Sequence, residues 1–258
     1  MHSSLDDISI SIVTVCKNSQ ETLGATIASV IAQKDMGLEY IIIDGCSTDG
    51  TKVIIDSFAD NIDVFISEPD NGIADAFNKG IRHSSGDIIG IINSDDALLP
   101  GCLASVATFF HENPHTEVLH GDVLFYDRGK FVKRISPPQH WWLPWRMSTL
   151  NIHAATFVRR EVYERHGLFD TSYRYAMDDD LFLKWVKQGV KISYIPETLA
   201  RVAAGGVSGR FAFSVFWEKR KALLRNGFPW LPSTIQYASR IIGQIVIMAQ
   251  QAARRVQR

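Results

Sequence analysis

The sequence of 258 residues predicts an α/β fold, with an open, mostly parallel sheet flanked by helices. Two observations predict it. Short apolar, β-branched runs alternate along the first hundred residues with segments of helical periodicity, and the links between them are short. The composition, 46% hydrophobic and 21% charged, is that of a globular protein and excludes the disordered and collagen-like classes.

The elements of the first half follow one another regularly. The apolar run at 8–15 predicts a buried strand, and the apolar spacing at 19–33 predicts a helix after it. Further strands are expected at 39–44, 62–67 and 88–92, and a helix at 72–82. After the second strand, a helix capped by Thr48 or Asp49 would place its apolar side at Val53, Ile54, Ser57 and Phe58.

The second half is less regular. We expect helices at 103–111, 159–166 and 179–188, strands at 117–126 and 190–195, and an aromatic loop at 140–146. From residue 205 onwards, nine Lys and Arg accompany a single acid, Glu218. This predicts a folded domain at 1–205, with halves at 1–100 and 101–205, and a basic, partly amphipathic helical extension at 206–258.

Charge and cysteine content restrict the partners and the compartment. The body of the chain is acidic and lacks the basic face of a DNA-binding domain, so we expect no nucleic-acid partner. The start of the chain has no basic stretch followed by an apolar run, and three cysteines are too few and too scattered for a disulfide framework or a zinc site. A cytoplasmic location is expected.

The extension leaves two interpretations open. Residues 235–258 combine apolar and basic positions, and their longest apolar run is far below the ~20 residues that cross a bilayer. They could contact the inner face of the cell membrane peripherally, as basic amphipathic helices do. Alternatively, they pack on the body of the protein or on a second subunit.

Polar clusters follow three of the predicted strands. Asp44 follows the second strand, 68–70 the third, and Asp95 with Asp96 the fourth. Ligands of open α/β sheets bind outside the carboxyl ends of the strands. We therefore expect these clusters to share one binding edge.

The segment Asn93-Ser94-Asp95-Asp96 has two interpretations. Two adjacent carboxylates suit Mg²⁺ or Mn²⁺, which in turn bind diphosphate oxygens. They could also be solvated acids of an Asx turn or a helix cap. The Gly-rich segment DGCSTDGT at 44–51 is neither a P-loop nor a GxGxxG fingerprint, so phosphates would have to be held by a metal.

Several segments in fixed order resemble the family 2 glycosyltransferases of the GT-A fold, which has a Rossmann-like sheet. They are SIVTVCKNSQETLGATIASVIAQ, YIIIDGCSTDGT, SEPDNGIADAFNKGI and GDIIGIINSDD, and further on HAATFVRREVYERHGLFD and YAMDDDLFLKW. The resemblance covers 8–205. It implies an inverting enzyme with a nucleotide-sugar donor (a UDP-sugar is favoured) and Mg²⁺ or Mn²⁺. It also implies a glycan or lipid-linked saccharide acceptor in envelope polysaccharide assembly.

The resemblance also implies roles for single residues. Thr14 and Val15 would line the nucleoside pocket, Asp44 would bind the base, and Asp70 is counted with the donor-binding residues. Asp95 would lie near the ribose or the sugar, Asp96 would hold the metal, and His153 would face the donor or the metal. Asp178 matches the catalytic carboxylate, the general base of an inverting transfer.

Asp178, Asp179 and Asp180 are open to a second interpretation, because acids favour the first turn of a helix. Asp179 and Asp180 could cap that helix while Asp178 points into the cleft.

The sequence also departs from the family pattern. Ala76-Phe77-Asn78 stands where many relatives have Ala-Arg-Asn, so the role of that arginine passes to Lys79 or Arg82, or is absent. Trp141, Trp142 and Trp145 either stack on a sugar or pack their loop onto the core.

Two other functions compete with sugar transfer. One is a nucleotidyltransferase acting on sugar phosphates, which would need a better basic Gly-rich loop after the first strand than Cys16-Lys17-Asn18-Ser19. The other is a glycan-binding module without turnover. The joint presence of Asp95, Asp96 and Asp178 argues against that module.

Overall fold

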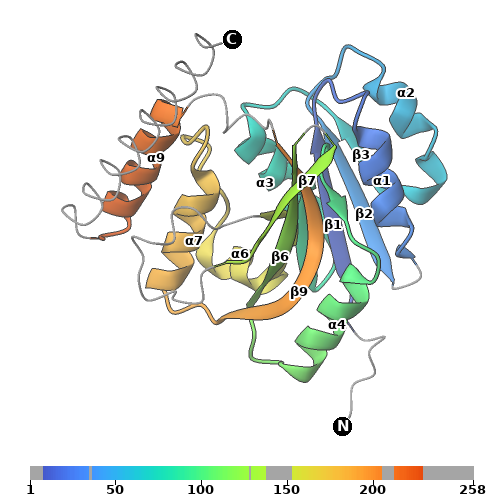
Figure 1. The fold of residues 1–258 in the computed structure, drawn as a ribbon. Coiled ribbons are helices and arrows are strands. Elements are labelled where there is room, and N and C mark those ends of the chain that lie inside the picture. Colours follow the sequence, from blue (N-terminus) through green and yellow to red (C-terminus); the bar gives the residue numbers. More distant parts are fainter. Residues whose placement is uncertain (1–7, 35–36, 128, 138–152, 205–211, 229–258) are drawn as a thin grey trace, which may run out of the picture.

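A mixed β-sheet forms the centre of the protein, and helices pack against both of its faces (Figure 1). The computed structural model describes residues 8–34, 37–127, 129–137, 153–204 and 212–228. Within them the strands lie in the order β3-β2-β1-β4-β8-β6-β9-β5, and β7 pairs with β6. The predicted α/β architecture is confirmed.

The strands are β1 Ile10–Cys16, β2 Leu38–Asp44, β3 Val64–Ser67, β4 Ile88–Asn93, β5 Ala97–Leu98, β6 Val118–Asp127, β7 Lys130–Ile135, β8 Thr156–Arg159 and β9 Ile192–Ala203. The helices are α1 Leu23–Ile31, α2 Thr51–Asp56, α3 Ile73–His83, α4 Cys102–Glu112, α6 Arg160–His166, α7 Met177–Lys187 and α9 Ala212–Arg225. Two short 3₁₀ helices are η3 Ala59–Asn61 and η4 His153–Ala155.

The first four strands are parallel and end at one edge of the sheet. β1 pairs with β2 and β4, and β2 pairs with β3. The register sets Cys16 opposite Asp44, and Asp44 opposite Ser67. Every residue of β1 is buried, which explains its unbroken apolar and β-branched pattern, because helices cover both faces of such a strand.

Two hydrophobic clusters lie on opposite faces of the sheet. Alternate side chains of a strand point to opposite faces, so Ile12 belongs to one cluster and Val13 to the other. The cluster of Ile12 includes buried residues of α1 and α4. The cluster of Val13 includes residues of α3, α6 and α7, and also Ala222 and Leu223 of α9. Helix α9 of the C-terminal extension therefore contributes to the core.

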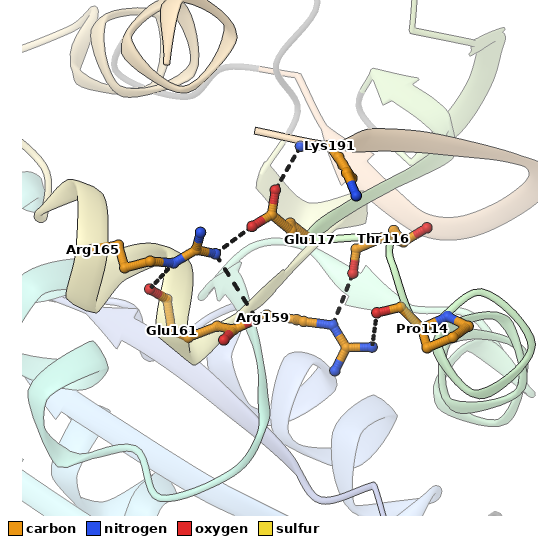
Figure 2. A network of polar contacts seen from close by, with 7 residues as sticks. All are labelled: Pro114, Thr116, Glu117, Arg159, Glu161, Arg165 and Lys191. Carbon is orange, nitrogen blue, oxygen red and sulfur yellow. Dashed lines mark hydrogen bonds and ion pairs between the residues drawn. The ribbon is translucent and has the colours of Figure 1, made fainter. Parts of the chain in front are cut away.

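An antiparallel strand, β8, joins the two halves of the sheet. It pairs with β4 on one side and with β6 on the other. Figure 2 shows the polar network at its end: Arg165 bonds to Glu117, which also accepts the backbone N–H of Lys191 at 2.8 Å. Arg159 donates to the carbonyl oxygen of Thr116 at 2.8 Å. These contacts fix β8 at the amino ends of β6 and β9.

Four strands and one helix differ from the sequence prediction. β5, β7 and β8 were not expected, and β9 continues to Ala203 beyond the predicted end at 195. The register of β6 and β9 shifts between Tyr194 and Thr198, so Pro196 lies in an irregularity where its missing N–H is tolerated. The buried residues of α2 are Thr51 and Ile55. Of the predicted apolar side, Ile54 and Phe58 pack half-buried against the core, whereas Ser57 is exposed and Val53 is 71% exposed.

The extension predicted at 206–258 contains α9, which lies beside α7 (Figure 1). No helix within the described ranges has the length and apolar character needed to cross a membrane. Residues 235–258 and the tryptophan loop at 140–146 lie outside the described residues.

Candidate active site

The turns after β1, β2 and β4 are joined by side-chain hydrogen bonds. The Ser47 hydroxyl accepts the backbone N–H of Asn18 at 2.8 Å, which connects the turns after β1 and β2. The hydroxyls of Ser19 and Ser94 lie 2.8 Å apart, which connects the turn after β1 with the acidic segment after β4. Because the polar segments converge here, this edge is the candidate site.

Thr14, Val15 and Asp44, which were expected to bind the nucleoside, are buried. The Thr14 hydroxyl lies 3.0 Å from the Tyr40 hydroxyl. The Asp44 carboxylate accepts the Ser47 backbone N–H at 3.1 Å and the Ser67 hydroxyl at 2.7 Å. The two Asp44 contacts hold the turn after β2. Contacts of Thr14, Val15 and Asp44 with a nucleoside stay a prediction.

Asp70 lies against the same turn. One of its oxygens accepts the backbone N–H of Gly72 at 3.0 Å, and the other would lie 2.1 Å from a β-carbon added at Gly45. Only glycine at 45 leaves room for this approach. The Lys79 amine is bound to the Pro69 carbonyl oxygen at 2.7 Å and to Glu68 at 2.8 Å, so it stabilises the turn that carries Asp70.

Asp95 and Asp96 lie in the turn after β4. Asp96 is only 6% exposed, and one of its oxygens accepts the backbone N–H of Ala203 at 3.1 Å. Burial, and secondarily the negative charge of Asp95, raise the pKa of Asp96 to about 7 against the opposing influence of His153. A buried carboxylate of this kind favours a nearby positive charge.

His153 contacts Asp178 and is influenced by the charges of the acidic turn. Its Nδ1 lies 3.0 Å from the Asp178 carboxylate, and its ring packs on Phe77 with ring centres 5.2 Å apart. Burial opposes the charged form of the imidazole, but the Asp178, Asp96 and Asp95 carboxylates outweigh it, so the pKa of His153 is raised. His153 therefore contacts Asp178 and is influenced by the charges of Asp95 and Asp96, the residues to which the family resemblance assigned the base, donor and metal roles.

The three consecutive acids of α7 have different partners. Asp179 pairs with Lys219 at 3.0 Å, and Asp180 accepts from the Asn226 amide at 3.0 Å. Both partners belong to the extension, whereas Asp178 contacts His153. No side chain caps α7, so the expectation that Asp179 and Asp180 are the caps is wrong.

A cavity of about 20 Å³ lies between His153, Asp178 and Trp185. That volume holds a single water molecule and is far too small for a sugar. A sugar bound next to Asp178 would therefore have to lie on the other side of the His153–Asp178 pair, towards the acidic turn.

A divalent cation fits the donor set of this turn. Within the described residues, no lysine or arginine forms an ion pair with Asp95 or Asp96, and the buried Oδ1 of Asn93 has no hydrogen-bond partner. No three His, Cys, Asp or Glu side chains of the described part are grouped to hold a metal. Mg²⁺ commonly uses one or two carboxylates and completes its shell with water and substrate phosphates, which agrees with this set.

Sequence reasoning missed Glu218. Its carboxylate accepts the backbone N–H groups of Arg174, Tyr175 and Ala176, directly before α7. One signal was present, because Glu218 is the only acid in the basic stretch from 205 to 258.

Comparisons with known proteins agree on the family. The model of the family described as glycosyl transferase family 2 matches residues 11–167. A PGL/p-HBAD biosynthesis glycosyltransferase of Mycobacterium bovis is 25% identical over 249 residues, which cover 92% of this chain and 94% of that protein. The putative glycosyltransferase EpsE of Bacillus subtilis is 26% identical over 200 residues, 75% of this chain and 72% of that protein.

Solved structures share the fold. S. aureus TarS 1–349 in complex with UDP-GlcNAc superposes with a TM-score of 0.65 at 16% identity, covering 90% of this chain and 71% of that one. A mannosyltransferase from Pyrobaculum calidifontis in complex with GDP-Man and Mn²⁺ gives 0.63 at 18% identity, with 95% and 79% covered. The predicted GT-A fold is confirmed. Because the family model spans more than half of the sequence, this chain is a glycosyltransferase and belongs to glycosyltransferase family 2.

Proposed function

We propose that the protein is an inverting, metal-dependent transferase that moves a sugar from a nucleotide-diphosphate sugar, with UDP-sugars favoured, to a glycan or lipid-linked saccharide. The observation that carries the proposal is the 3.0 Å contact of His153 with Asp178, while the charges of Asp95 and Asp96 also act on the same imidazole. This supports a candidate base and a candidate metal site that belong to one active site.

In this mechanism Asp178 is the general base. Its carboxylate takes the proton from the acceptor hydroxyl as that oxygen attacks the anomeric carbon of the donor. The bond between this carbon and the diphosphate oxygen breaks on the opposite face, which inverts the configuration. The 3.0 Å contact with His153 holds the Asp178 carboxylate in one orientation during proton transfer.

Asp96 is the residue best suited to hold a divalent cation, with Asp95 beside it. Such a cation neutralises the negative charge that develops on the departing diphosphate. Asp44, Asp70, Thr14 and Val15 are proposed to form the nucleoside side of the donor site. Support comes from the shared edge on which their turns meet the acidic turn.

Calorimetric binding of UDP, GDP and dTDP, each with and without Mn²⁺, tests the proposal. We expect one nucleotide to bind tightly only with Mn²⁺. In Asp96→Asn, Mn²⁺ should no longer increase the affinity for that nucleotide. Asp87→Asn is the matched control, because Asp87 bonds to the Ser9 hydroxyl at 2.7 Å at the amino end of β4. Binding without Mn²⁺ dependence would refute the metal assignment, and binding without any turnover of the sugar conjugate would indicate a binding module.

A further inference from the structure

Helix α9 of the C-terminal extension is tied to the segment that leads into α7 (Figure 1). The Glu218 carboxylate accepts three consecutive backbone N–H groups, those of Arg174 at 3.1 Å, Tyr175 at 2.7 Å and Ala176 at 3.0 Å. Ala176 is the N-cap residue directly before α7, and its side chain cannot cap a helix. Asp178 follows two positions later.

These bonds are of the strong kind. A carboxylate that accepts from backbone amides forms charge-assisted hydrogen bonds, which are about twice as strong as neutral ones. The negative charge of Glu218 also lies near the N-terminus of α7, where the helix dipole favours an anion. A single side chain thus fixes the backbone directly before the helix that carries the candidate base.

Further contacts from α9 restrict the same helix. Lys219 pairs with Asp179 at 3.0 Å and Asn226 binds Asp180 at 3.0 Å, so two of the three acids are held on the α9 side. Leu223 is fully buried in the cluster that includes Leu181 of α7. With α7 anchored in this way, rotation of its first turn is restricted and Asp178 is kept on the side of His153.

We propose that Glu218 is a positioning residue for Asp178, and that α9 is therefore a working part of the active site. This inference rests on the proposed function, because it assigns to Glu218 an effect on the base that Asp178 provides. Glu218 touches neither the acidic turn nor the turns after β1 to β3, so its effect is confined to the chemical step and leaves donor binding intact.

The test uses the full chain and the release of nucleotide diphosphate from a UDP-sugar with Mn²⁺, with water as acceptor. Glu218→Ala is expected to lower kcat roughly 10- to 100-fold, because small displacements of a catalytic group have effects of this size, and to change the donor KM by less than about twofold. Glu218→Gln keeps an acceptor oxygen and should lose less. Glu164→Ala is the matched control, since Glu164 is a 61% exposed glutamate whose nearest ion-pair partner is Arg160 at 3.6 Å.

A double-mutant cycle with Asp178→Asn separates positioning from a general loss of structure. If Glu218 acts through Asp178, Glu218→Ala does not lower kcat any further in a chain that already carries Asp178→Asn. Multiplicative losses, or a raised KM with unchanged kcat, would overturn the inference. Should Glu218→Ala fail to fold, Glu218→Gln carries the same cycle.

Hydrogen exchange of the amides at 174–180 gives a readout that does not depend on activity. We expect faster exchange there in Glu218→Ala and unchanged exchange in Glu164→Ala. A wild-type chain that turns over no nucleotide sugar refutes the proposed function, and exchange then decides on the Glu218 contact by itself. An active wild type with unchanged kcat in Glu218→Ala refutes the inference alone.

Discussion

Acidic side chains lie at both the amino ends and the carboxyl ends of the strands, but the groups that bind them differ. At the amino ends of the strands, Glu117 is bound by Arg165 and by the Lys191 backbone, and Glu39 accepts the Ser85 backbone N–H at 2.8 Å. At the carboxyl ends, Asp96 is buried beside Asp95, and no lysine or arginine in the described part of the chain pairs with either.

Under the proposed function, the acids at the carboxyl ends serve the reaction, whereas those at the amino ends stabilise the fold. Acids whose charge is matched by protein donors contribute to stability through those hydrogen bonds. An acid buried without a matching cation lowers stability in the empty protein and gains its partner from a ligand. Three substitutions test this comparison.

The largest effect is expected at the carboxyl edge. Asp178→Asn removes the proton acceptor while keeping the shape of the side chain, so kcat should fall roughly 10²- to 10⁴-fold, the usual contribution of a general base. Donor affinity should stay unchanged, because the acidic turn is intact. Steady-state kinetics and calorimetry on the same preparation measure both. Full activity in this variant would move the base to another residue.

At the amino edge we expect a loss of stability and no loss of activity. Glu117→Gln weakens the contacts with Arg165 and the Lys191 backbone but keeps an acceptor oxygen, at a cost of roughly 0.5–1.5 kcal/mol in unfolding free energy. Urea denaturation measures it. Activity per folded molecule should equal that of the wild type, and a selective loss of kcat would break the distinction between the edges.

The stability difference at Glu117 should depend on pH. Burial opposes ionisation of Glu117, but hydrogen bonds from the Lys191 N–H and Arg165 outweigh it, so the pKa of Glu117 lies below its ordinary value of 4.5. The unfolded chain therefore binds the proton first as pH falls. The advantage of wild type over Glu117→Gln should be complete above about pH 4.5 and vanish as pH falls through the lowered pKa.

The smallest effect has the opposite sign. Asp96→Asn replaces a buried carboxylate by a neutral amide, so the metal-free variant should be more stable than the wild type at pH 8. A gain of about 1 kcal/mol corresponds to ~2–4 °C in Tm for a chain of this size. Calorimetric melts in EDTA measure it. A lower Tm would show that the bond from the Ala203 N–H outweighs the cost of the buried charge of Asp96.

The first half of the fold could be predicted because its signals are local. β1, β2 and β4 are almost wholly buried and consist mostly of apolar and β-branched residues, a pattern that a single sequence displays. β8 has only four residues, and β9 continues through Pro196, which normally ends a strand. Their pairing depends on partners far away in the sequence, which no local pattern reveals.

The site shows the same division. The acids at the strand ends could be found from their positions, and the family resemblance selected Asp178 among three neighbours. In the structure, long-range contacts distinguish Asp178 from its neighbours, because Lys219 binds Asp179 and Asn226 binds Asp180. Glu218 could not have been assigned, because its partners are backbone amides about 42 residues earlier.

The bond between the Ala203 N–H and Asp96 spans 107 positions of the chain, and β5 beside it pairs with the end of β9. During synthesis on the ribosome, β1 to β4 can pair soon after they emerge, whereas the turn that holds Asp96 waits for β9. Closing so long a loop is slow relative to local folding. A nascent chain that stalls before β9 therefore carries four parallel strands, while the turn with Asp96 still lacks the bond to Ala203 that completes it.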